Sequence, residues 1–233
     1  MSEPIVELVD VTKTYRQGTV DVHALRGLNL RVDQGDFLSI SGPSGSGKTT
    51  ALNLIGALDV PTSGTVRLEG RDLSGLSRQE RSHLRRDRVG FVFQAYNLLP
   101  VLTAFENAEQ VLSLQGVPKP ERQRRVKALL AELGLEGLED RRPAELSGGQ
   151  QQRVAIARAI AAQPAVVLAD EPTANVDSET SEHLIAIMER LNHEHGMTFV
   201  FSTHDPRVIE HAHRNVHMVD GRVATDERKA PAA

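Results

Sequence analysis

Residues 42–49 read Gly-Pro-Ser-Gly-Ser-Gly-Lys-Thr, and they lie between the apolar run Phe37–Ser41 and a stretch with helical spacing. The apolar residues of that stretch recur as one face of a helix does: Ala51, Leu52, Leu54, Ile55 and Leu58. The order is therefore strand, glycine-rich loop and helix. This order is typical of a loop whose backbone N–H groups surround a phosphate at a helix N-terminus.

The eight residues match the pattern G-x-x-x-x-G-K-[ST], in which glycines let the backbone approach phosphates closely. Lys48 is expected to bridge the outer phosphates, Thr49 to ligate magnesium, and Thr50 to reach the inner phosphate. The nucleotide-binding residues predicted here are Gly42, Pro43, Ser44, Gly45, Ser46, Gly47, Lys48, Thr49 and Thr50. The alternative is a chance Gly/Ser-rich turn, and the flanking strand and helix argue against it.

A second apolar run, residues 165–169, ends in Asp170 and Glu171. Open parallel sheets bind ligands at the carboxyl ends of their strands, so both carboxylates are expected at such an edge. Asp170 is predicted to hold magnesium, and Glu171 to orient or deprotonate the attacking water. The alternative is an Asp-Glu pair that merely opens a loop before Pro172, and the phosphate-binding loop upstream weakens it.

Residues 146–150 read Leu-Ser-Gly-Gly-Gln and precede an Ala-rich stretch with helical spacing. A serine cap, two glycines and a helix N-terminus form a second anion site by the same physics as the first. The segment resembles the signature motif of the ABC ATPase superfamily. That resemblance implies that Ser147, Gly148, Gly149 and Gln150 bind the ATP held by a second copy, across a two-fold interface. A Ser-capped helix with a Gly-rich lead-in is the alternative.

The resemblance covers nearly the whole chain and implies roles for further positions. Tyr15 is similar to the aromatic on which adenine stacks, although a single strand tyrosine is also ordinary. Gln94, in Phe-Val-Phe-Gln, is similar to the glutamine that contacts magnesium and senses a membrane subunit; taken alone it is a surface glutamine. Residues 175–177 resemble the loop through which the two chains communicate. His204, in Ser-Thr-His-Asp, resembles the histidine that contacts the γ-phosphate and positions the water.

The distribution of apolar runs predicts an α/β fold. Residues 5–11, 24–32 and 65–68 are strand-like and separated by Gly-containing turns, whereas residues 101–163 have mostly helical spacing. Strand-like runs then return at 165–169 and 198–202 with a helix between them, which indicates a parallel sheet. The expected class is a P-loop NTPase (RecA-like) core with a mostly parallel sheet, an N-terminal antiparallel β-subdomain and an inserted helical subdomain.

The chain is expected to form a single ABC-type nucleotide-binding domain over residues 1–233. Residues 1–94 and 164–225 are assigned to the core with its antiparallel β lobe, and residues 95–163 to a mainly helical lobe. A hairpin is predicted around Asp220-Gly221. Residues 226–233 are expected to be a flexible tail.

Composition limits the remaining choices. No run approaches the roughly 20 apolar residues of a membrane helix, and the acidic start is unlike a signal peptide, so a cytoplasmic chain is expected. The absence of cysteine excludes disulfides and thiolate metal sites. Lys and Arg (27) nearly balance Asp and Glu (31), and aromatics are 3%, so no nucleic-acid partner is expected. The basic clusters within residues 78–88 and 122–127 are interpreted as solvated helix faces.

Several strings resemble the branch that contains lipoprotein-release, macrolide-exporter and cell-division ATPases: Gly-Pro-Ser-Gly-Ser-Gly-Lys, Phe-Val-Phe-Gln-Ala-Tyr-Asn-Leu-Leu-Pro and Ser-Thr-His-Asp-Pro-Arg-Val. Ala174 and Val176 depart from it, since the branch more often has Gly and Leu there. The resemblance implies an integral membrane permease on another chain, reached from the cytoplasmic face of the cell membrane.

The expected function is ATP hydrolysis that drives export or substrate extraction through that permease, with ATP and Mg²⁺ bound. The alternative is a regulatory ATPase that signals across the membrane without moving cargo. A third class, soluble machines acting on DNA or ribosomes, is disfavoured for two reasons. The stretch from Gln94 to Ser147 contains no sustained heptads, and each motif occurs once.

Overall fold

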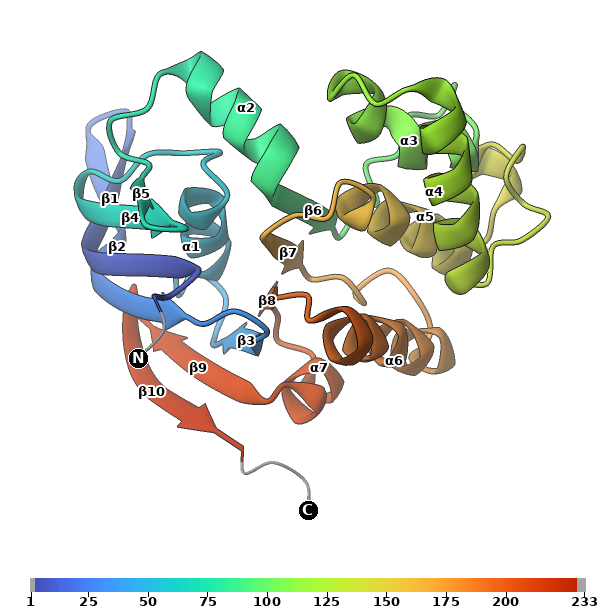
Figure 1. Ribbon diagram of the computed structural model, residues 1–233. Helices are drawn as coiled ribbons and strands as arrows, with labels where there is room; N and C mark the ends of the chain where they lie inside the picture. The colour runs from blue at the N-terminus through green and yellow to red at the C-terminus, as the bar shows by residue number, and fades with distance from the viewer. Residues whose placement is uncertain (1–2, 230–233) are drawn as a thin grey trace.

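The computed structural model describes residues 3–229, which form ten strands and seven α-helices (Figure 1). The strands are β1 (Val6–Gln17), β2 (Val20–Val32), β3 (Phe37–Ser41), β4 (Ser63–Leu68), β5 (Arg71–Asp72), β6 (Val89–Phe93), β7 (Val166–Asp170), β8 (Phe199–Ser202), β9 (Arg214–Val219) and β10 (Arg222–Arg228). The helices are α1 (Lys48–Ile55), α2 (Arg78–Arg88), α3 (Ala104–Leu114), α4 (Lys119–Glu132), α5 (Gly148–Ile160), α6 (Ser178–His195) and α7 (Pro206–His211), with a 3-10 turn at Pro143–Glu145.

The strands form two sheets. The first has the order β2-β1-β4-β5 and is antiparallel, and the second has the order β10-β9-β3-β8-β7-β6. In the second sheet β9, β3, β8, β7 and β6 run parallel, and only β10 pairs antiparallel, with β9. The predicted α/β class, with a mostly parallel core sheet and an N-terminal antiparallel sheet, is confirmed.

The parallel sheet separates two hydrophobic cores. Successive residues of a strand point to opposite faces, and β7 follows this rule: Val167 and Ala169 pack with residues of α3 to α6. Val166 and Leu168 pack in the other core, with α1 and the antiparallel sheet. Strands buried on both faces read as continuous apolar runs, which explains the sequence of residues 165–169. Helix α1 and the loop before it are thereby held between the two sheets.

Local sequence signals explain where the main helices begin and end. Helices α2, α3 and α5 each begin with a capping box, in which Ser77, Thr103 or Ser147 exchanges hydrogen bonds with the residue three positions on. Helix α6 ends at Gly196, whose φ of 63° is the left-handed conformation that glycine adopts without strain. Helix α5 packs against both α3 and β6, so the boundary of a helical lobe at residue 163 stays a prediction.

Three expectations need correction or extension. The strands predicted at 5–11 and 24–32 are longer, because β1 and β2 continue into a hairpin that ends at Gln17 and Val20. Strand β6 was not predicted from the sequence. The expectation of a flexible tail from residue 226 is wrong for residues 226–228, which belong to β10, and residues 230–233 lie outside the described part of the chain.

Within residues 3–229, none of the helices combines the length and the apolar character that crossing a bilayer requires.

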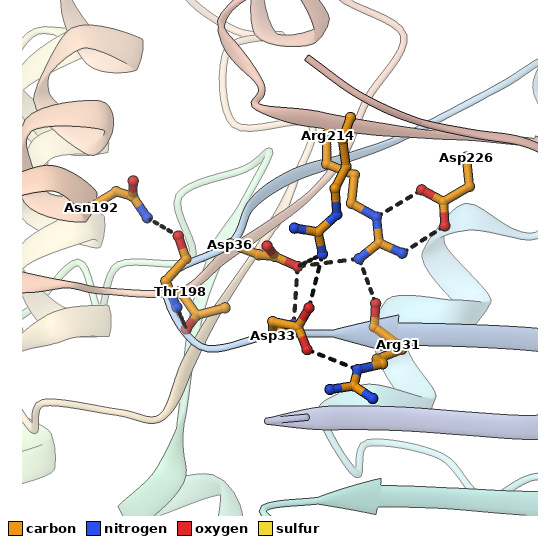
Figure 2. Close-up of polar contacts among 9 residues, drawn as sticks. Arg31, Asp33, Asp36, Asn192, Thr198, Arg214 and Asp226 are labelled. Carbon is orange, nitrogen blue, oxygen red and sulfur yellow. Dashed lines mark hydrogen bonds and ion pairs between the residues drawn. The ribbon is translucent and has the colours of Figure 1, made fainter. Parts of the chain in front are cut away.

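Strand β10 is held by a cluster of three arginines and three aspartates, here called the Arg214 cluster (Figure 2). Its members are Arg31, Asp33, Asp36, Arg214, Asp226 and Arg228. The Arg214 guanidinium donates to both oxygens of Asp226, at 2.7 and 2.6 Å, and to Asp36 Oδ2 at 3.2 Å. Its side chain is only 8% exposed. These bonds hold residues 226–228, which local sequence alone does not order.

Replacing Arg214 with methionine is expected to lower the free energy of unfolding by about 2 to 4 kcal/mol, because it removes the nearly buried guanidinium that pairs with both Asp226 and Asp36 and leaves Asp36 with the more exposed Arg228 as its cationic partner. Hydrogen bonds from Arg31 and Arg214 lower the pKa of Asp33 and Asp226, respectively. Carboxylates with lowered pKa stabilise the fold above their unfolded pKa of about 4, and this contribution is lost as pH falls.

The difference between wild type and Arg214→Met should therefore shrink below about pH 4. Urea titrations at several pH values measure it. Arg228→Met is the control, because the Arg228 side chain is 56% exposed and its ion pairs are screened, so about 1 kcal/mol or less is expected. An equal loss of stability in both variants would contradict the assigned role of Arg214.

Candidate active site

The loop between β3 and α1 is shaped by glycines that no other residue can replace. A Cβ atom on Gly42 would lie 2.1 Å from the carbonyl oxygen of Met218, and one on Gly47 would lie 2.5 Å from that of Ala24. Both residues also have positive φ, 140° and 98°. The loop is therefore packed against β9 and β2 through bare backbone, which brings its N–H groups and the start of α1 to one place.

The ammonium group of Lys48 lies over this loop. Its Nζ donates to the carbonyl oxygens of Gly42 at 2.8 Å and Pro43 at 3.0 Å, and the residue is 9% exposed. A nearly buried cation beside a helix N-terminus favours an anionic ligand with several oxygens. This arrangement fits the phosphates of a nucleotide.

A cleft of about 670 Å³ opens beside the loop and gathers most of the predicted site. It is lined by Tyr15, Val22, His23, Ala24, Gly42, Pro43, Ser44, Gly45, Gly47, Lys48, Thr49, Thr50, Gln94, Glu171, Ala174 and His204. Ser46, also predicted, does not line the cleft; it is buried, and its hydroxyl has no hydrogen-bond partner among the described residues. Asp170 reaches the cleft through Thr49, whose Oγ1 lies 3.2 Å from Asp170 Oδ1.

The polar side chains of the cleft come from neighbouring strand ends. Gln94 follows β6, Asp170 ends β7 with Glu171 next, and His204 follows β8. Since β6, β7 and β8 are adjacent and parallel, their carboxyl ends meet at one edge of the sheet. His204 Nδ1 lies 2.7 Å from Glu171 Oε1. Sequence reasoning predicted these residues, and the fold brings them together.

The Tyr15 ring is fixed by contacts that the sequence did not reveal. Its hydroxyl donates to Asp59 Oδ2 at 2.8 Å, and Lys13 Nζ lies 4.9 Å from the ring centroid while also donating to Asp59 Oδ1. Burial, and then the hydrogen bond to Asp59, raise the pKa of the Tyr15 phenol. An ammonium above an aromatic face is a favourable cation–π contact.

Three further cleft residues, Val22, His23 and Ala24, were missed because only strand register places them. Tyr15 pairs with Val22 in the β1–β2 hairpin, which therefore lies beside the tyrosine. His23 pairs with Thr14, and the Thr14 hydroxyl lies 2.9 Å from its Nδ1. No spacing in the sequence signals these contacts.

The signature segment, residues 146–150, does not face the cleft. Ser147 Oγ accepts from the Gln150 N–H at 3.3 Å, and Gln150 Oε1 accepts from the Ser147 N–H at 2.8 Å. Ser147 and Gly149 line a different hollow of about 860 Å³, together with Asp177 and Thr180. A single chain therefore keeps the starts of α1 and α5 in separate hollows.

The signature glycines have a packing role of their own. A Cβ on Gly148 would lie 2.9 Å from Tyr96 Oη, and one on Gly149 would lie 2.4 Å from the Thr180 methyl carbon. Asn175 Nδ2 donates to the Gln94 carbonyl at 2.8 Å, and Tyr96 Oη donates to the Asn175 carbonyl at 3.0 Å. These contacts connect the segment after β6 with the loop at 175–177 and the start of α5.

Comparison with known proteins places this geometry in a family. A family model described as "ABC transporter" matches residues 25–174. The macrolide export ATP-binding/permease protein MacB of Syntrophobacter fumaroxidans is 49% identical over 219 residues, which are 93% of this chain and 31% of that protein. An uncharacterised ABC transporter ATP-binding protein of Thermotoga maritima is 48% identical over 97% of this chain and 96% of its own length.

A solved structure shares the fold closely. The ATP-binding cassette MJ0796 of Methanocaldococcus jannaschii, in a dimeric post-hydrolysis state bound to ADP and Pi, matches with a TM-score of 0.88 and 44% identity. The match covers 96% of this chain and 98% of that one. The chain described here therefore belongs to the ABC transporter family, in which it is an ATP-binding cassette.

Proposed function

We propose that this chain is an ATPase subunit that closes on ATP with a second copy of itself and drives export or substrate extraction through a separate membrane subunit. The observation that carries the proposal is the separation of the two helix starts that are predicted to bind anions. The phosphate loop, Glu171 and His204 line one cleft, whereas Ser147 and Gly149 line another hollow. A second copy is the natural source of a signature segment for this cleft, and the dimeric MJ0796 cassette supports that arrangement.

The main polar groups of the cleft have roles in this proposal. Lys48 and the loop N–H groups bind the outer phosphates, because charge-assisted hydrogen bonds to phosphate oxygens are the strongest available. Glu171 accepts the proton of the attacking water or orients that water. His204, with a side chain that is 76% exposed, contacts the γ-phosphate. Tyr15 stacks on adenine with the ring face opposite Lys13.

The donor set beside the phosphates suits magnesium. Thr49 Oγ1 and Asp170 Oδ1 lie 3.2 Å apart, and the Gln94 side chain lines the same cleft. Hard divalent cations prefer oxygen ligands, and Mg²⁺ usually takes one or two carboxylates with substrate phosphates. When bound, the metal neutralises charge that develops on the phosphate oxygens. Thr49, Gln94 and Asp170 are the proposed ligands.

The proposed partner is an integral membrane permease, which would place the chain at the cytoplasmic face of the cell membrane. The MacB relative is named for macrolide export and carries ATP-binding and permease parts, and this chain spans 31% of its length. Co-purification with a four-span membrane protein that bears a large outside domain would support this partner. A cargo assay on that complex then tests transport, because a regulatory ATPase would hydrolyse ATP without moving cargo.

The proposed docking surface is a hollow of about 370 Å³ between the sheet and the helices after it. Its lining includes Leu58, Arg85, Phe91, Asn97, Val111 and Arg158. Asn97 belongs to residues 95–101, the segment after Gln94. Leu98 packs into the core and so anchors this segment, whereas Leu99 is 40% and Val101 72% exposed. The Arg158 guanidinium donates to the backbone carbonyls of Tyr96 and Asn97 and thereby holds the segment in place. An apolar helix from a partner fits such a rim.

A photo-cross-linker at position 97 is expected to capture the membrane subunit in the assembled complex. The same cross-linker at Asp21, an exposed residue of the β1–β2 hairpin, is the control and should capture none. Mass spectrometry of the cross-linked products identifies the partner. Equal capture from both positions, or none from position 97, would count against docking at this hollow.

A further inference from the structure

The carboxylate of Glu171 is held by two consecutive residues that follow β8, one on each oxygen. Thr203 Oγ1 donates to Glu171 Oε2 at 3.1 Å, and His204 Nδ1 lies 2.7 Å from Oε1. The backbone of Glu171 also needs support, because its φ of 47° is left-handed and unfavourable for a residue with a side chain. Its N–H donates to the Ser202 carbonyl at 2.9 Å. The end of β8 therefore decides where this carboxylate lies.

The Thr203 hydroxyl has a defined polarity. Its oxygen accepts from the Asp205 N–H at 2.9 Å, while a carboxylate oxygen can only accept, so the hydroxyl proton must point at Glu171. Thr203 is completely buried, and its own N–H donates to the Ile40 carbonyl of β3 at 3.1 Å. A buried hydroxyl with fixed neighbours on both sides is a rigid support for the carboxylate.

The support extends back to the loop that carries Glu171. Asp205 Oδ2 accepts from the Thr173 hydroxyl at 2.8 Å, and Thr173 is 2% exposed and lies two residues after Glu171. Arg207 donates to both oxygens of Asp205. Glu171, Thr203, Asp205 and Thr173 thus form a closed chain of contacts that joins the segments after β7 and β8.

His204 differs from Thr203 in exposure. Its side chain is 76% exposed, and exposed ion pairs contribute little to holding a geometry. The histidine can therefore leave Glu171 for another ligand, whereas buried Thr203 stays. We infer that Thr203 is the positioning residue that orients the Glu171 carboxylate for hydrolysis. This inference rests on the proposed role of Glu171 as the base.

The simpler explanation is that the Thr203 hydroxyl only satisfies hydrogen-bonding groups of a buried loop. The two explanations predict different effects on the kinetics of hydrolysis. A loop that loosens as a whole disturbs nucleotide binding and stability, whereas a misplaced base slows the chemical step alone. Thr203→Val keeps the volume and removes the hydroxyl, and Thr203→Ser keeps the hydroxyl and removes a methyl group.

In the full chain, Thr203→Val is expected to lower kcat by about 10- to 100-fold, because small misplacements of a catalytic group cost this much. The KM for ATP should change by no more than about twofold, since the phosphate loop is untouched. Thr203→Ser should restore most of the lost kcat. A Thr203→Val protein with wild-type kcat, or with lost ATP binding, would overturn the inference.

The final measurement combines Thr203→Val with Glu171→Gln. If Thr203 acts through Glu171, the double variant should hydrolyse no more slowly than Glu171→Gln alone. An additional fall in the double variant would show that Thr203 acts elsewhere. If Glu171→Gln hydrolyses ATP slowly and Thr203→Val hydrolyses it at the wild-type rate, only this inference fails. If Glu171→Gln itself hydrolyses normally, the proposed function of the site fails first.

Discussion

Glu171→Gln is expected to bind ATP as the wild type does and to hydrolyse it about 10² to 10⁴ times more slowly, the range for loss of a general base. Glutamine keeps the size of the side chain and removes its charge. Lys48 and the loop N–H groups stay in place to hold the phosphates. Because the γ-phosphate is not hydrolysed, the signature segment of the second copy stays bound to it, and the variant should accumulate as a dimer.

Size-exclusion chromatography with magnesium and ATP measures this outcome. The wild type should run as a monomer or a transient dimer, and Glu171→Gln as a stable dimer. Adding Ser147→Arg should abolish the dimer, because a bulky cation replaces the cap at the start of α5. A Glu171→Gln protein that stays monomeric at saturating ATP, or that hydrolyses normally, would remove the shared-site mechanism.

Lys48→Ala is expected to weaken ATP binding strongly and to slow turnover even more. The alanine removes the ammonium group at the loop, and Lys48 is the only lysine or arginine among the described residues that line the cleft. Hydrogen bonds to charged groups contribute about 1.5 to 3 kcal/mol each, so affinity should fall by about 10- to 100-fold. Turnover should fall further, by about 10²-fold or more, because the same cation stabilises the transition state.

Binding of a fluorescent ATP analogue and steady-state phosphate release test the two parts separately. Lys127→Ala is the matched control, since Lys127 is an exposed lysine of α4 and should leave both measurements unchanged. If Lys48→Ala hydrolyses ATP as the wild type does, the assignment of the phosphate loop is wrong.

The parts of this site that the sequence predicted are those whose chemistry is local. The phosphate loop and the first residues of α1 lie within residues 42–49, directly after β3, and their glycines and lysine are close together in the chain. Asp170 and Glu171 were predicted because an apolar run ends there, and strand ends of parallel sheets carry ligand-binding groups. The capped start of α5 could be read from Ser147 and Gln150, three residues apart.

The contacts and elements that the sequence did not predict depend mostly on segments that are far apart in the chain. Tyr15 is tied to Asp59, 44 residues away, and Glu171 is supported by Thr203, 32 residues away. Strand β6 is short, and its apolar pattern carries no length or turn signal that separates it from a helix. Residues 226–228 were expected to be flexible because they lie near the C-terminus, and Arg214 pairs with Asp226 to hold them.

By itself, the sequence determined the fold class and the family, and it predicted the residues proposed to bind phosphate and to supply carboxylates, because loops, caps and strand ends are specified by neighbouring residues. Only the tertiary structure decided which groups share a cleft. It placed Gln94, Glu171 and His204 at one edge by setting β6, β7 and β8 side by side, and it kept the signature segment away from them. The reason is that strand order and helix packing depend on burial of apolar surface across the whole chain, which no short segment encodes.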